Sequence, residues 1–257
     1  MMINYLPGAP TTESDTVTVD RRINFILHQL NRAHYPRALD IGIGFGTYAN
    51  RLIEYAEEVV GIDISRENLT GIRCSNKGGS VELLQMSAES LGFPESSFDL
   101  VLLIDVIEHL ADDQRAISEI CRILKPGGLL FMTVPNKLFP FETHGCHFQG
   151  KQVDTHYFGV PLLPYLPESW RAHYANARIY TPWRLKQRLG SVGFHIRKTK
   201  YIGPNFDKIK MRYPGSIFFI NIFQRCSSIL DDIPLFQLFS TTIMVCAEKR
   251  ICNPAES

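Results

Sequence analysis

The most constraining feature of this chain is a glycine-rich turn between an apolar strand and an amphipathic helix. Residues 39–41 (Leu-Asp-Ile) lead into residues 42–46 (Gly-Ile-Gly-Phe-Gly), and apolar side chains return at helical spacing from Ala49 to Ala56. In an α/β sheet such a turn brings backbone N–H groups to the carboxyl end of a strand, where no Cβ atom keeps a ligand away. The turn therefore predicts a ligand site on an open α/β sheet.

The rest of the chain alternates short apolar runs with amphipathic segments. A helix from Val19 is expected to end at Pro36, Asp112 is expected to cap another, and Thr181-Pro182 to start a third. The expected strands are 38–41, 58–62, 81–84, 98–104, 129–134, 194–202 and 241–248. This alternation is typical of βαβ units and predicts a largely parallel sheet.

We expect a single α/β core with two insertions. The core comprises residues 18–135, 181–202 and 241–249. The first insertion, 136–180, is rich in Pro, His and aromatic residues and is expected to lie over the active site; the second is 203–240. Residues 1–17 are expected to form a flexible N-terminal segment and 250–257 a C-terminal tail.

Composition excludes several classes of protein. With 45% hydrophobic residues the chain is too apolar to be disordered, and no apolar run reaches the roughly 20 residues that span a bilayer. The 27 Lys and Arg residues nearly balance 26 Asp and Glu residues, which argues against nucleic acid as a partner. Six scattered cysteines without a CxxC pair are expected to be reduced. We therefore expect a cytoplasmic globular protein.

The glycine spacing indicates a nucleoside ligand other than a dinucleotide. Thr47 stands where the dinucleotide-binding fingerprint requires its third glycine, and glycine occurs at Gly46 instead. Asp40 would repel a pyrophosphate but suits an ammonium group. Asp63, at the end of the next strand, can accept hydrogen bonds from a ribose diol. Adenosine joined to an amino acid meets these demands, so the residues predict S-adenosylmethionine.

Further motifs follow in order and resemble those of the class I S-adenosylmethionine-dependent methyltransferase family, in its small-molecule and lipid branch. They are residues 87–94, 98–110, 124–128 and the ending at 185–194. The resemblance covers residues 37–135 well and 180–202 with 241–249 loosely. It implies a Rossmann-like α/β sandwich with helices on both faces of a seven-stranded, mostly parallel sheet whose last strand is antiparallel.

The resemblance also implies which residues bind the cofactor. They are Asp40, Gly42, Gly44, Asp63, Ile64, Ala88, Glu89 and Asp105. The first three would hold the methionine end, with Asp105 behind it. Asp63 and Ile64 would contact the ribose and one adenine face, and Ala88 and Glu89 would lie beside the adenine. Ser87 stands where many members carry an acid that binds the adenine amino group, so that contact would fall to the backbone or Glu89.

Methyl transfer to oxygen needs a base that removes a proton. His144 and His109 are the candidates because both follow strands that end at the ligand site. The alternatives are that His109 and Glu108 stabilise the next helix and that His144 is a loop histidine bonded to backbone. A divalent metal site formed by His144, His147, Asp154 and His156 is a further interpretation. Their spacing matches no recognised ligand pattern, so we expect no metal.

The chain from Phe194 into the second insertion is basic, and the insertion itself is partly amphipathic. Between Phe194 and Leu230 there are seven Lys and Arg residues and a single acid, Asp207. Apolar residues of 216–230 fall on one helical face. We favour a lid over the sheet and pocket; the alternative is peripheral contact with an anionic membrane.

The leading functional hypothesis is transfer of a methyl group to a small-molecule or lipid-linked acceptor, at oxygen. A protein substrate and a non-catalytic cofactor-binding or scaffold role are the alternatives. Residues 105–108 are Asp-Val-Ile-Glu rather than the Asn/Asp-Pro-Pro-Tyr type of sequence in base-amino methyltransferases, which disfavours nucleic acid. The sequence does not fix the oligomeric state.

Overall fold

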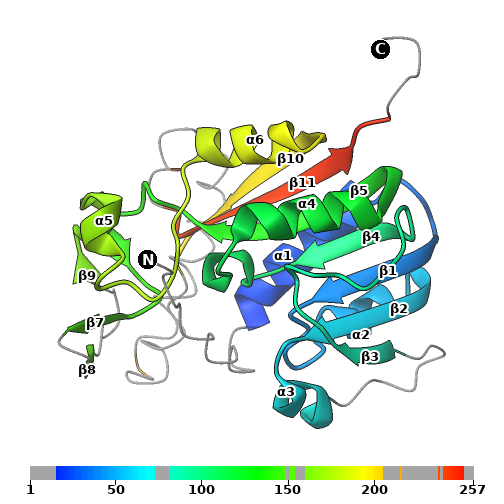
Figure 1. The fold of residues 1–257 in the computed structure, drawn as a ribbon, viewed down its shortest axis with the longest axis horizontal. Coiled ribbons are helices and arrows are strands. Elements are labelled where there is room, and N and C mark those ends of the chain that lie inside the picture. The colour runs from blue at the N-terminus through cyan, green and yellow to red at the C-terminus, as the bar shows by residue number, and fades with distance from the viewer. Residues whose placement is uncertain are drawn as a thin grey trace.

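Seven strands pair into one central sheet, and inner strands such as β4 (Phe98–Leu103) are buried along their whole length because helices cover both faces (Figure 1). The computed structural model describes residues 16–72, 81–148, 151–153, 160–204, 215, 237 and 240–251. The strand order is β3 (Val81–Gln85), β2 (Ala56–Asp63), β1 (Tyr35–Ile41), β4 (Phe98–Leu103), β5 (Leu124–Pro135), β11 (Thr242–Lys249) and β10 (Phe194–Ile202). The neighbouring strands β3, β2, β1, β4 and β5 are parallel to one another, and β11 is antiparallel to both its neighbours, β5 and β10. The predicted sheet is confirmed.

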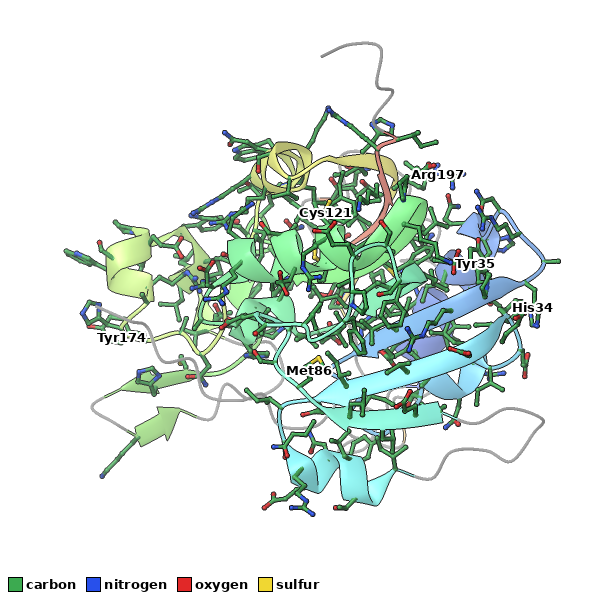
Figure 2. All side chains as sticks on the ribbon, turned by 45° about the vertical axis from the view of Figure 1, so that its right-hand side comes forward. His34, Tyr35, Met86, Cys121, Tyr174 and Arg197 are labelled. Carbon is green, nitrogen blue, oxygen red and sulfur yellow. The ribbon has the colours of Figure 1, made fainter. Side chains whose placement is uncertain are left out.

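Helices cover both faces of this sheet (Figure 1). On one face lie α4 (Asp113–Ile123) and α6 (Pro182–Ser191), and on the other α1 (Thr16–Gln29) and α2 (Ala49–Leu52). Strand β1 alternates between the two cores, with Leu39 packing toward α4 and α6 and Ala38 toward α1 and α2. Cys121 of α4, labelled in Figure 2, donates its thiol to the Val192 carbonyl just beyond α6 at 3.0 Å.

Two predicted helix starts are present, with different caps. Asp112 accepts the Arg115 N–H at 3.0 Å and so caps α4 as predicted. Helix α6 begins at Pro182 as predicted, but Thr181 makes no side-chain capping bond. The shorter α3 (Arg66–Gly71) follows β2 and is capped by Ser65.

Several predicted boundaries were wrong. Helix α1 ends at Gln29, and Pro36 is the second residue of β1 rather than a helix terminator. Proline is tolerated there because a strand's first residues need not donate to the ladder. The helix expected to run to Ala56 stops at Leu52, since Ala56 begins β2 and pairs with Tyr35. The strand expected over 129–134 is longer, since β5 already begins at Leu124.

The chain after β5 folds into small units over the carboxyl ends of the strands (Figure 1). Strands β6 (Phe141–Glu142) and β9 (Val160–Pro161) form one pair, and β7 (Cys146–Phe148) and β8 (Lys151–Val153) another. A 3₁₀ turn, η2 (Leu163–Tyr165), and α5 (Glu168–Arg171) follow. Tyr174, just after α5, lies at the edge of this region (Figure 2). The division into core and insertions stays a prediction.

The second predicted insertion falls largely outside the described residues, which include only 203, 204, 215, 237 and 240 of it. Its predicted amphipathic helix lies outside them entirely. In the part of the chain that the structure describes, no helix is long and apolar enough to cross a membrane.

Candidate active site

The glycine turn is anchored to the neighbouring strand by two backbone bonds. Gly42 and Ile43 donate their N–H groups to the Ile62 carbonyl at 2.8 and 3.0 Å. Gly42 has a φ of +71° and packs so closely on Val106 that a Cβ atom would clash with that side chain. Gly44 has a φ of +53°, but a Cβ built there would find only the Gly42 oxygen, at 3.9 Å. Gly44 therefore borders open space, as a cradle for a ligand requires.

Asp40 supplies a buried carboxylate beneath this turn. It is 2% exposed, and its Oδ2 has no hydrogen-bond partner among the described residues. Burial, with a further contribution from the nearby Asp63 charge, raises the pKa of Asp40 to about 7. A buried carboxyl with an unused oxygen fits an ammonium group, so the turn and Asp40 suit the methionine end of S-adenosylmethionine.

Asp63 and Ile64 lie at the end of β2, where the sequence predicts contacts with the ribose and adenine. Asp63 accepts the Ser65 N–H (2.8 Å) and the Asn68 side-chain amide (3.1 Å), one on each oxygen. Each oxygen keeps a second lone pair that a ribose hydroxyl can use. The Ile64 side chain is 67% exposed, which leaves an apolar surface for an adenine face.

Ala88 and Glu89, the residues predicted to lie beside the adenine, have contacts within the protein itself. Ala88 is buried in the core at 6% exposure. The Glu89 carboxylate accepts the Asp112 N–H at 2.8 Å and thereby helps to fix the start of α4. The sequence analysis did not predict this bond between Glu89 and Asp112. The proposed contact of Glu89 with adenine stays a prediction.

Asp105 follows β4 in a left-handed conformation, with a φ of +55°. Arg22 of α1 binds it with two guanidinium nitrogens, and Thr133 of β5 donates a hydroxyl at 2.9 Å. Burial acts to raise the pKa of Asp105, but the Arg22 charge, together with the hydrogen bonds from Arg22 and Thr133, outweighs burial and holds that pKa below its usual value. Arg22 also lies 3.5 Å from the hydroxyl of Tyr48, just after the glycine turn. Neither Arg22 nor Tyr48 was predicted.

His144 lies between two buried carboxyl groups, as part of a cluster at the carboxyl ends of β4 and β5. Its Nε2 is 3.7 Å from Glu108 Oε1, and its Nδ1 is 3.7 Å from Glu142 Oε1. Glu108 is fully buried in η1 (Ile107–His109), and Glu142 is 1% exposed. The His109 and His144 ring centroids are 6.4 Å apart. The structure thus brings both predicted histidines together.

The neighbouring charges shift the pKa values of the two histidines in opposite directions. Burial opposes charge on His144, but Glu142 and Glu108 outweigh it and raise its pKa above the usual value. Burial and the neighbouring His144 lower the pKa of His109. Burial, followed by repulsion from Asp105, raises the pKa of Glu108 to about 7. His144 therefore carries a proton more readily than His109.

Glu108 and Glu142 are the residues that sequence reasoning missed here. Glu108 was considered only as a helix-stabilising residue, yet neither carboxylate oxygen has a hydrogen-bond partner within the described ranges. The side chain therefore serves no cap. Glu142 stands two residues before His144, and that spacing was the available signal.

The metal interpretation gains no support from the described residues. His147 Nδ1 lies 3.0 Å from the side-chain oxygen of Asn176, while Asp154 and His156 lie outside the described residues. Over the described part of the chain no three His, Cys, Asp or Glu residues form a metal-binding group. The expectation of no metal stays a prediction.

Comparisons with known proteins find methyltransferases. Residues 39–132 match the family described as methyltransferase domain. A ubiquinone biosynthesis O-methyltransferase of Xanthomonas oryzae pv. oryzae is 27% identical over 184 residues, which are 66% of this chain and 77% of that protein. Another, from Chelativorans sp., is 35% identical over 159 residues, covering 61% of this chain and 58% of the relative.

A solved structure shares the fold. The S-adenosylmethionine dependent methyltransferase from Mesorhizobium loti has a TM-score of 0.59 and 17% sequence identity, and the match covers 93% of this chain and 99% of that one.

Proposed function

Because this chain belongs to the class I S-adenosylmethionine-dependent methyltransferase family, we propose that it transfers a methyl group to an oxygen atom of a small-molecule acceptor. The observation that carries the oxygen assignment is His144, held between the Glu108 and Glu142 carboxyl groups. A hydroxyl acceptor must lose its proton during transfer, and a histidine whose positive charge is stabilised by carboxylates accepts one well. The names of the two relatives point the same way.

S-adenosylmethionine is the cofactor, and when bound it supplies a methyl group on a positively charged sulfur. We propose that Asp40 holds the ammonium group, that Gly44 leaves room for the methionine chain, and that Asp63 holds the ribose. Arg22 is a nearly buried cation beside the same turn, which suits it to the methionine carboxylate. Asp105 then fixes Arg22 rather than contacting the cofactor directly.

For the protein's own chemistry, His144 is the proposed base and His109 the alternative. His144 would remove the acceptor proton, and the nearby Glu108 and Glu142 charges would stabilise the imidazolium. The remaining work is alignment and exclusion of water by the units that follow β5.

The finer identity of the acceptor is also a proposal. A lipid-like acceptor, with peripheral membrane contact through residues 203–240, is supported by the amphipathic pattern of 216–230 and by the seven Lys and Arg residues against one acid between Phe194 and Leu230. Sedimentation with anionic liposomes that is reversed by salt is the expected result; no sedimentation at low salt would contradict it.

Methyl transfer from isotopically labelled cofactor to a panel of phenols, carboxylic acids and amines tests the function. We expect O-methylated products, with rates that collapse in His144→Ala. Labelling of amines alone, or of added protein alone, would overturn the oxygen assignment. Cofactor binding without any turnover would favour the non-catalytic alternative.

A further inference from the structure

We propose that Glu142, paired with Arg171, is a positioning residue that holds the His144 ring from its Nδ1 side and leaves Nε2 as the basic nitrogen. This inference rests on the proposed function, because it assumes that His144 is the base. It concerns Glu142 and Arg171, two residues of the segment after β5 to which the sequence analysis gave no role.

The two oxygens of Glu142 have different partners. Oε1 accepts the backbone N–H of His144 at 3.1 Å and lies 3.7 Å from His144 Nδ1. Oε2 makes no hydrogen bond among the described residues and lies 3.6 Å from Arg171 Nη1. Glu142 therefore joins a fully buried guanidinium to the proposed base.

The burial of the charged Arg171 side chain requires a partner of opposite charge. Its side chain is fully buried, and a buried guanidinium is costly unless it is paired. Nη1 donates to the Ala177 carbonyl at 2.7 Å, and Nη2 donates to Glu168 at 3.2 Å. Glu168 is 44% exposed, so Glu142 is the buried carboxylate that faces this cation in the described structure.

The backbone holds both partners in place. Glu142 pairs with Val160 in the β6–β9 ladder, and Arg171 ends α5, which follows closely after β9. The Arg171 carbonyl accepts the N–H groups of Tyr174 and Ala175 at 2.9 and 2.8 Å. A carboxylate fixed in this way can orient a ring in a manner that a mobile side chain cannot.

The consequence for His144 is a preferred tautomer. A carboxylate near Nδ1 favours the proton on that nitrogen and leaves Nε2 as the basic one. The other groups that face the ring are Glu108 near Nε2, the His109 ring, the more distant Asp105 charge and the Thr143 hydroxyl, 3.3 Å from Nδ1. Among these, Glu142 is the carboxylate on the Nδ1 side.

Nitrogen-15 NMR of the His144 ring tests this on the full chain, without acceptor. In Glu142→Gln we expect the titration midpoint of His144 to fall below that of wild type and the Nδ1–H tautomer to lose population. The matched control is Glu168→Gln, which removes the other carboxylate of Arg171 and should leave both observables unchanged. A His144 titration and tautomer that are unaltered in Glu142→Gln would overturn the proposal.

Glu142→Gln leaves Arg171 facing an uncharged group, so folding of that variant must be secured separately. The double variant Glu142→Gln/Arg171→Met removes both charges at nearly constant volume and should show the same change in His144. In turnover, Glu142→Gln should lower kcat about 10- to 100-fold with KM for the cofactor unchanged, and move the acid limb of the pH profile to lower pH. Glu142→Asp, which keeps the charge, should restore part of the lost kcat and part of the shift in the pH profile.

Turnover of His144→Ala distinguishes failure of the proposed function from failure of the positioning role of Glu142. If His144→Ala keeps wild-type turnover, His144 is not the base, whatever its ring titration shows. If His144→Ala is inactive but Glu142→Gln leaves the ring titration and tautomer unchanged, the base stands and the positioning role falls.

Discussion

Arg22 and Asp105 form a two-point ion pair across the carboxyl end of the sheet, although they are 83 residues apart in sequence. Arg22 Nη2 lies 3.0 Å from Asp105 Oδ1, while its Nη1 binds Oδ2 and approaches the Tyr48 hydroxyl. One guanidinium thus ties helix α1 to the residue after β4 and borders the glycine turn. The pair connects the stability of the N-terminal helix to the cofactor site.

Replacement of Arg22 tests that connection. Arg22→Met should lower the free energy of unfolding by about 3 kcal/mol at pH 7, because Asp105 is left without its cation. The folded-state pKa of Asp105 is lowered, so its contribution is present above the usual Asp pKa of about 4 and is lost as the pH falls through the folded value. Urea unfolding of wild type and Arg22→Met at pH 7 and in acid measures the loss of stability and its dependence on pH.

Arg32→Met is the control for this experiment. Arg32 is 55% exposed and pairs with Asp99 at 3.6 Å, so its loss should cost less than about 1 kcal/mol. Equal losses for the two variants at pH 7 would contradict a special role for Arg22.

Gly44 provides a test of the cofactor site. Gly44→Val puts a side chain into the open space beside the turn and strains a φ of +53°, so cofactor affinity should fall at least about 100-fold. Gly190→Ala is the matched control, since a Cβ there meets nothing within 4 Å and α6 gains helix propensity. Calorimetry with the demethylated cofactor measures both; tight NAD binding by wild type would contradict the site assignment.

Removal of each candidate base distinguishes His144 from His109. His144→Ala should lower kcat about 10²–10⁴-fold with cofactor affinity nearly unchanged, because proton removal belongs to the reaction step. His109→Ala should have a smaller effect, since its lowered pKa makes it the weaker proton acceptor. If His109→Ala causes the larger loss in steady-state turnover, the two roles must be exchanged.

Much of the fold was predictable because it depends on local patterns. The glycine turn, the apolar strands and the Asp112 cap are each set by neighbouring residues, and all three are present. The Pro36 prediction failed because a proline ends a helix only where the helix would otherwise continue.

The site was predictable only where its residues belong to one strand end or one turn. Asp40 and Gly44 are of this kind. Arg22 and Glu142 are placed by tertiary contacts with Asp105 and Arg171, the first across 83 residues and the second across the segment that holds β7, β8, β9 and η2. Sequence periodicity carries no information about such pairings.

Glu108 should make stability depend on pH. Its pKa is raised to about 7 in the folded protein but is about 4.3 in an unfolded chain, so the folded state binds more protons between these values. Its contribution to stability is therefore full below pH 4 and lost as the pH rises toward 7. Glu108→Gln, which cannot ionise, should be more stable than wild type at pH 8 by about 2 kcal/mol, with the difference disappearing near pH 4. Thermal unfolding in which the difference is the same at both pH values would contradict this.

Asp40 should couple cofactor binding to proton release. Burial raises its pKa to about 7 in the free protein, so near pH 6 the carboxyl is mostly protonated. An ammonium group placed against it favours the charged form, so binding should expel the proton and affinity should rise with pH up to about 7. Calorimetry in two buffers of different ionisation enthalpy would then give different heats. The control variant Asp40→Asn has no such proton, so the part of the buffer dependence that Asp40 contributes should disappear along with some affinity. Equal buffer dependence in Asp40→Asn and wild type would mean that the ammonium group binds elsewhere.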